Sequence, residues 1–164
     1  MRKFGFVILM LVARIASAQK IDLKALDKIG INASSKTEMN MDGAALKSAA
    51  TTLSEKNGDE AIAKKTVENL TGFYMRAYEF DKKGSFNIED LKPILDQLKE
   101  PDWKPIIRVQ EKGELTEIWI HSTKGEPDGM VLIAAEEDEV VVMNGVGVTN
   151  LSDLTALGKM NALK

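Results

Sequence analysis

The chain has 164 residues, with 22 Lys and Arg against 25 Asp and Glu, one histidine and no cysteine. The absence of thiols excludes disulfides, thiolate metal sites and cysteine nucleophiles, and the single His121 excludes a metal site built from several imidazoles. An acidic chain without a basic run also argues against binding to nucleic acid or to an anionic membrane surface.

The N-terminus has the pattern of a secretory signal peptide. Two basic residues precede an apolar run from Phe4 to Ala13, and the small residues Ala16-Ser17-Ala18 follow it. The apolar run is about half as long as the roughly 20 residues that a membrane-spanning helix needs. We therefore expect cleavage to remove residues 1–18 and to leave residues 19–164 as a single domain. That domain keeps 19 basic residues against 25 acidic ones, a net charge of −6.

The missing cysteine also bears on where the protein resides. A bacterial lipoprotein needs a cysteine at the cleavage site to carry its acyl chains, and none follows Ala18. We therefore expect an exported protein that is soluble in the periplasm and has no stable membrane anchor after cleavage.

The first part of the mature chain has helical spacing. Apolar residues spaced three and four apart predict a short amphipathic helix from Ile21 to Ile29. The polar segment 32–40 is expected to be a linker or irregular segment, with a short extended piece around Glu38 to Met41 as an alternative. Asp42 is a good N-cap for a second helix. Asp59 can cap a third helix, which runs to about Leu70.

The stretch from Leu70 to Asp81 is the first strand signal and organises the rest of the chain. Side chains alternate across a strand, so one of its faces is apolar and the other carries rings and a guanidinium. The apolar face holds Phe73, Met75 and Ala77, and the mixed face holds Tyr74, Arg76 and Tyr78.

A turn-rich loop and a helix follow this strand. The loop from Asp81 fails as a calcium site, because its glycine is at the fourth position and lysines replace oxygen ligands. Asp90 is the expected N-cap of the next helix, since this places Pro93 in the first turn. We expect Trp103 to seal that helix against the sheet as a core-edge residue.

From Pro105 onward the period changes to two. Two strands flank a turn at Lys112-Gly113-Glu114, a further turn separates them from a strand that is apolar on both faces, and an acidic turn leads to the last strand. A final helix begins at Asn150 or Ser152 and carries Leu151, Leu154 and Leu157. The strands are 106–112, 115–122, 130–135 and 140–143, with the turns at 126–129 and 136–139.

The order of these elements predicts an α+β fold. Successive hairpins with helices clustered elsewhere favour a largely antiparallel sheet of about five strands, with the helices packed on one face.

Several segments together resemble a known family. The signal peptide, TGFYMRAYEFD, DLKPILDQL, PDWKPII, GMVLIAAEEDEVVVMNGVG and the closing LSDLTALG are similar to the bacterial family called domain of unknown function 4252. The resemblance implies an exported envelope protein of Gram-negative bacteria and supplies no catalytic residues. Some members are described as lipoproteins, and this chain departs from them because it lacks the cysteine.

The sequence offers little for an enzyme, and we assign no catalytic, cofactor-binding or metal-binding residue. A Ser-His-Asp arrangement would depend entirely on His121, and no G-x-S-x-G surrounds a serine. The glycines of GVGV at 145–148 lack the partners of a phosphate-binding loop. A small periplasmic hydrolase with an acid and His121 in its site remains the alternative function.

The leading interpretation is a non-enzymatic binding or protein-interaction module that uses an open face of the sheet. If the apolar faces of the strands pack under the helices, the opposite face gathers an aromatic and cationic set. We expect it to bind an envelope protein, a small anion, a glycan or a second copy of the chain; an ordinary solvated sheet face is the competing explanation. The candidate interaction residues are Tyr74, Arg76, Tyr78, Arg108, Trp119 and His121.

Overall fold

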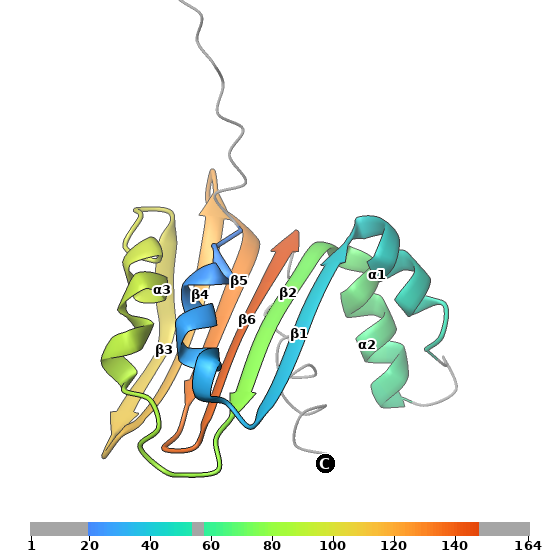
Figure 1. Ribbon diagram of the computed structural model, residues 1–164. Helices are drawn as coiled ribbons and strands as arrows, with labels where there is room; N and C mark the ends of the chain where they lie inside the picture. Colours follow the sequence, from blue (N-terminus) through green and yellow to red (C-terminus); the bar gives the residue numbers. More distant parts are fainter. Residues whose placement is uncertain (1–19, 54–57, 148–164) are drawn as a thin grey trace, which may run out of the picture.

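The computed structural model describes residues 20–53 and 58–147, which form one antiparallel sheet with helices (Figure 1). The strands are ordered β1-β2-β6-β5-β4-β3 across the sheet, and every neighbouring pair is antiparallel. Their bounds are β1 (Ser35–Asp42), β2 (Leu70–Glu79), β3 (Trp103–Glu111), β4 (Glu114–Thr123), β5 (Glu126–Ala135) and β6 (Glu139–Gly147). The α+β class and the antiparallel sheet are thus as predicted, with six strands in place of about five.

The additional strand is β1, in the segment that the sequence presents as a linker. Its sequence, SKTEMNMD, is polar because β1 is an edge strand, and none of its side chains is fully buried. Edge strands commonly carry charged and polar residues, which hides them from a search for hydrophobic alternation.

The helical elements are η1 (Leu23–Asn32), α1 (Gly43–Ala50), α2 (Gly58–Asn69), η2 (Ile88–Leu91) and α3 (Lys92–Gln97), of which η1 and η2 are 3₁₀ helices. Figure 1 shows η1 and α3 lying across one face of the sheet, while α1 and α2 lie beside the β1 edge. Asp42 caps α1 as predicted, because its Oδ1 accepts hydrogen bonds from the backbone N–H groups of Ala44 and Ala45.

Two local predictions are wrong. Asn87, not Asp90, is the N-cap of the η2 and α3 segment, and Asp90 instead completes a capping box by accepting from the N–H of Asn87. The turn expected at 126–129 lies earlier, at Lys124-Gly125, where both residues have positive φ as a tight hairpin turn requires.

The main core lies between the sheet and the layer formed by η1, η2 and α3. Leu26, Leu91, Ile94 and Leu98 from this layer are fully buried against sheet residues. Trp103 belongs to this core at 5% exposure, as predicted. The sheet contributes Tyr78, Phe80, Leu115, Trp119, Val131, Ile133, Ala135, Val140 and Val142.

The choice of covered face is the reverse of the prediction. Tyr78, Trp119 and Val131 face the helices, so their strand neighbours face away from them. A row of apolar side chains with one member from each strand runs across that other face, and none of the six is buried. The row is Met39, Met75, Met143, Leu132, Ile118 and Ile107.

Both faces of this sheet are rich in apolar atoms, so alternation alone does not decide which one the helices cover. Rings bury more apolar surface than methionine or isoleucine, and their polar tips are tolerated when each finds a partner. Asn144 is likewise a polar side chain that is tolerated in the core because its amide is hydrogen-bonded. It is fully buried, accepts from the N–H of Ile21 and donates to the carbonyl of Met130.

Two predicted segments, the signal peptide at 1–18 and the helix with Leu151, Leu154 and Leu157, lie outside the described residues. Across residues 20–53 and 58–147, no helix combines the length and the hydropathy needed to cross a membrane.

Candidate functional site

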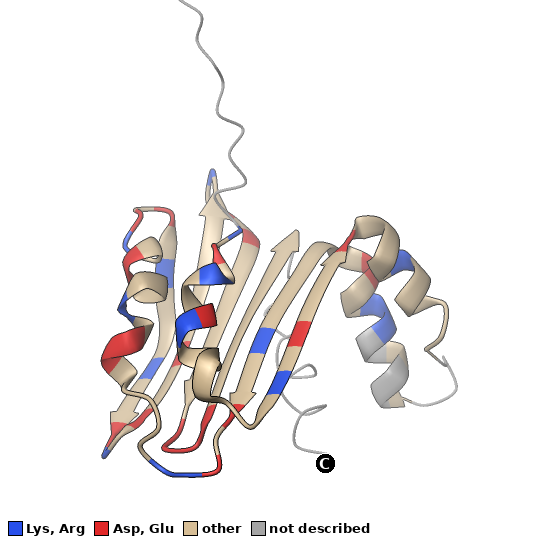
Figure 2. Ribbon diagram, in the orientation of Figure 1, with Lys and Arg blue, Asp and Glu red and all other residues tan. Residues whose placement is uncertain are grey.

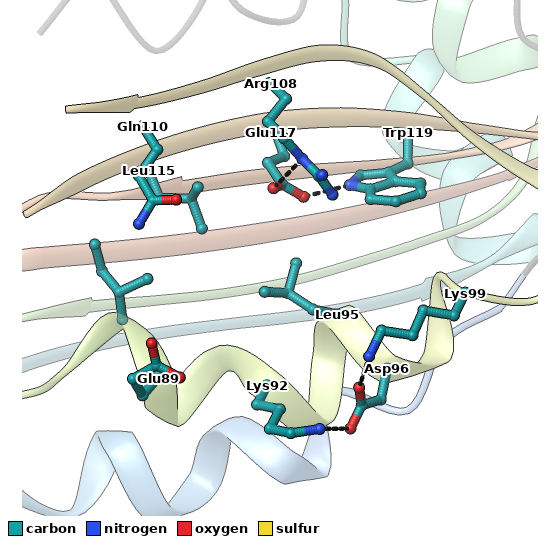
Figure 3. Close-up of a pocket in the computed structure, with 11 residues that line it drawn as sticks. Glu89, Lys92, Leu95, Asp96, Lys99, Arg108, Gln110, Leu115, Glu117 and Trp119 are labelled. Atoms are coloured by element: carbon teal, nitrogen blue, oxygen red, sulfur yellow. Dashed lines mark hydrogen bonds and ion pairs between the residues drawn. The ribbon is translucent and has the colours of Figure 1, made fainter.

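A groove of about 300 Å³ lies between α3 and the β3–β4 hairpin (Figure 3). This volume is at the lower end of the range for small-molecule sites. Ile88, Leu95, Leu115 and Trp119 form its apolar part. The polar and charged residues that line it are Glu89, Lys92, Asp96, Lys99, Arg108, Gln110 and Glu117.

The hairpin between β3 and β4 fixes the sheet side of the groove. Lys112 and Gly113 form its two-residue turn with φ of 37° and 91°, which matches the right-handed twist of the flanking strands. This turn sets a register in which Arg108 is opposite Glu117. Trp119 follows two residues after Glu117 and therefore lies on the same face.

Glu117 is the centre of a buried charged cluster. Its side chain is only 4% exposed, and its Oε1 lies 2.8 Å from Nε of Arg108. Its Oε2 accepts a hydrogen bond of 2.6 Å from Nε1 of Trp119. Both carboxylate oxygens are therefore paired, as a buried carboxylate requires.

Arg108 pairs with this buried carboxylate and is itself exposed to solvent. Its guanidinium lies 5.4 Å from the centre of the Trp119 ring, in cation–π range, while its side chain is 58% exposed. The ion pair uses Nε, and within the described residues the two terminal amino groups make no hydrogen bond. Those groups can therefore bind an acceptor brought by a ligand, with the planar fork that suits a carboxylate.

The helix side of the groove adds further charge. Lys92 and Lys99 both contact Asp96, at 2.6 Å and 2.5 Å, and the hydrogen bonds from these two lysines lower the pKa of the Asp96 carboxyl. With Glu89, which also lines this side, the helix side presents two basic and two acidic groups to the groove. Figure 2 shows the mixture of basic and acidic residues along α3, in contrast with the mostly uncharged β5 and β6.

Two of the six predicted interaction residues meet at this groove, and these are Arg108 and Trp119. The prediction that the set lies on an uncovered face is wrong, because Tyr78, Trp119 and His121 are buried at 1%, 7% and 2% exposure. Arg108 alone is well exposed.

Tyr74 and Arg76 lie away from the groove. Tyr74 is half-buried, and Nζ of Lys20 lies over its ring, 3.8 Å from the centroid, in a cation–π contact. Arg76 is 9% exposed, donates to Asn40 and to the carbonyl of Met75, and lies 3.6 Å from the carboxylate of Glu38. Hydrogen bonds to Asn40 and Met75 therefore satisfy one terminal amino group, while Nε is buried without a hydrogen bond among the described residues, near the Glu38 carboxylate.

His121 is buried apart from the groove lining. Its Nδ1 lies 2.5 Å from Oδ1 of Asp128, and its ring makes a T-shaped contact with the Trp103 ring. Its Nε2 is buried without a hydrogen-bond partner among the described residues. Among residues 20–53 and 58–147, no three His, Asp or Glu side chains converge as metal ligands would.

Sequence reasoning missed Glu117 and the α3 residues of the groove. Glu117 alternates with Trp119 and lies opposite Arg108, so a hairpin register drawn from the turn would have paired it with the arginine. Lys92, Asp96 and Lys99 carry no such signal, because helical charges at three and four residue spacing are common on solvated faces.

A model of the family described as "Domain of unknown function (DUF4252)" matches residues 17–157 of the chain. This match confirms the family resemblance expected from the sequence. A search of curated proteins gives no match.

Proposed function

We propose that this chain, which belongs to the family of the domain of unknown function DUF4252, is an exported, non-enzymatic binding protein. Its ligand site is the groove between α3 and the β3–β4 hairpin, and its ligand is a small anion that carries a carboxylate on an apolar or sugar framework. The observation that carries the proposal is the geometry of Arg108. Glu117 holds Nε of this residue, and the terminal amino groups remain available beside the Trp119 ring.

The neighbouring groups favour a carboxylate over a neutral ligand. Lys92 and Lys99 share Asp96 on the helix side, and their ammonium groups can donate to a ligand carboxylate, although Asp96 and Glu89 balance the charge of that side. Trp119 supplies a flat apolar surface on which a sugar ring or a hydrocarbon can lie. Glu117 does not repel such a ligand strongly, because its charge is matched by Arg108 and by the indole N–H.

The alternative, a periplasmic hydrolase that uses His121, has less support. A hydrolytic site needs a substrate within hydrogen-bond reach of the general base. The His121 ring is 2% exposed and has one acid, Asp128, beside it, in a place that does not line the groove.

Isothermal titration calorimetry tests the binding proposal. Citrate, D-glucuronate and N-acetyl-L-glutamate serve as probes, and D-glucose and N-acetyl-L-glutaminamide serve as uncharged counterparts of the last two. We expect at least one carboxylate to bind with a stoichiometry of one and its uncharged counterpart to give no heat. Arg108→Gln should lower the affinity at least tenfold, and Arg108→Lys should lower it less, because the charge is kept but the fork is lost.

Lys104→Gln is the matched control. It removes the same charge from an exposed position of the same strand, β3, on the face that points away from α3. Equal affinities of Arg108→Gln and the wild type, or no binding of any carboxylate, would refute the proposal.

Export is supported by the signal-peptide pattern of residues 1–18, and the missing cysteine argues against a lipid anchor on the exported protein. Mass spectrometry of the protein from a periplasmic fraction should give a chain that begins at Gln19. An intact Met1 and a cytoplasmic location would contradict export.

A further inference from the structure

We propose that the C-terminal segment of this chain, residues 148–164, folds back over the apolar sheet face that the helices leave uncovered, with Leu151, Leu154 and Leu157 as its contacts. This inference is independent of the groove and of any ligand.

The first observation is the composition of the face. The row Met39, Met75, Met143, Leu132, Ile118 and Ile107 crosses all six strands in register. Strands spaced about 4.8 Å apart spread this row over about 24 Å. A continuous apolar surface of this width is unusual on the outside of a monomer and marks a place where something binds.

The second observation is how incompletely these residues are buried. Leu132 and Met143 belong to β5 and β6, the two strands that pair with each other in the middle of the sheet, and still remain half-buried. On the helix-covered face of the same strands, Ile133 and Val142 are fully buried. The described residues therefore provide a layer for one face of the central strands and none of comparable extent for the other.

The third observation is where the segment starts. It follows Gly147, the last residue of β6, and β6 lies between β2 and β5 inside the sheet. A chain that leaves β6 therefore starts at one end of the sheet, between its two edges and within reach of the uncovered face. The 17 residues of the segment are enough to cross it, since even a helix of that length spans about 25 Å.

The fourth observation is the sequence of the segment. Leu151, Leu154 and Leu157 recur every three residues and would lie on one side of a helix. An apolar stripe of this kind needs an apolar partner, and the uncovered face supplies one. The family match also extends to residue 157, ten residues beyond the end of β6, so the leucines belong to the pattern of the domain.

Cross-linking of a cysteine pair tests the proposal in the full chain, because the protein has no cysteine of its own. Leu132→Cys is combined with Leu154→Cys, and a short bis-maleimide joins thiols that lie close together. We expect a cross-link within one chain, detected as a monomer on a denaturing gel and confirmed by peptide mass. A control pair combines Leu154→Cys with Lys24→Cys, an exposed position on η1 on the opposite face, and should give no such product.

Each other outcome overturns the proposal. A product of dimer mass would show that a second copy covers the face. Two reactive thiols without a cross-link would show that the segment lies elsewhere, as would equal cross-linking of the test and control pairs.

A second measurement uses the dye 8-anilinonaphthalene-1-sulfonate, which fluoresces on exposed apolar surface. The full chain with Leu151, Leu154 and Leu157 all changed to Ser should bind several times more dye than the wild type at neutral pH. Unchanged dye binding in that variant would contradict the proposal.

Discussion

The ring of Tyr78 lies so close to Gly30 that a Cβ atom placed on this glycine would stand 2.7 Å from Cε1 and Cζ of the ring. Gly30 belongs to η1 and Tyr78 to β2, and both are buried. The absence of a side chain at residue 30 therefore sets how closely η1 approaches the sheet.

Gly30→Ala should destabilise the fold by about 1–3 kcal/mol, because the added methyl group forces η1 away from a rigid ring. Urea denaturation measures the change in the free energy of unfolding. Gly58→Ala is the matched control, since nothing lies within 4 Å of its added methyl group, and should be neutral or slightly stabilising. Equal effects of the two substitutions would contradict the packing described for η1.

Trp119→Ala should lower the free energy of unfolding by about 3–5 kcal/mol, because it empties a core position and leaves Oε2 of Glu117 unpaired. A position on an open sheet face would instead tolerate the change with little effect on the melting temperature. Ile106→Ala, at a residue that is 48% exposed, should cost about 1 kcal/mol or less. A small effect of Trp119→Ala would contradict its burial in the core and would indicate that this face of the sheet is exposed to solvent.

Tyr78 should make stability fall at alkaline pH. Burial, with the charges of Asp27 and Glu38, raises the pKa of Tyr78 above 10.0. Its contribution is fully present below pH 10 and is lost as the pH rises from there through the folded pKa, because the unfolded chain releases the phenolic proton first. Denaturation of wild type and Tyr78→Phe between pH 9 and about 11.5 should show a steeper loss in the wild type. Parallel curves would rule out this effect.

Asp96 should make stability depend on pH in the acid range. The hydrogen bonds from Lys92 and Lys99 lower its pKa below 3.8, so its contribution is present above about pH 4 and is lost as the pH falls through the folded pKa. Asp96→Asn should flatten the pH dependence of stability in that window. The difference should shrink in 1 M NaCl, because exposed ion pairs are screened, and a difference that grows with salt would contradict it.

The sequence predicted elements better than it predicted faces. Period-two alternation predicted β2, β3 and β4, an apolar run bounded by turns predicted β5, and an acidic turn predicted the start of β6. These signals are local, as is the N-cap signal of Asp42, which the structure confirms. The full length of β1 was not predicted, because an edge strand can be polar and then lacks hydrophobic alternation.

Which face the helices cover depends on whether the polar atoms of the large side chains find partners, and most of those partners come from the neighbouring strand of the sheet. Arg76 is buried with Asn40 and Glu38, which precede it by more than 30 residues. Trp119 is buried because Glu117 accepts from its indole, and Glu117 is tolerated because the β3–β4 register brings Arg108 to it. The groove therefore follows from tertiary pairing and from where α3 packs, neither of which a pattern of apolar residues encodes.

The indole N–H signal of Trp119 in a proton–nitrogen NMR spectrum tests the binding site most directly. The chain has two tryptophans, so two such signals are expected, and Trp103→Phe identifies them by removing one. Addition of citrate or D-glucuronate should shift the Trp119 signal in a saturable way and leave the Trp103 signal in place, and Arg108→Gln should abolish the shift. A Trp119 signal that stays fixed at saturating ligand, or that moves equally in Arg108→Gln, would contradict a carboxylate site in this groove.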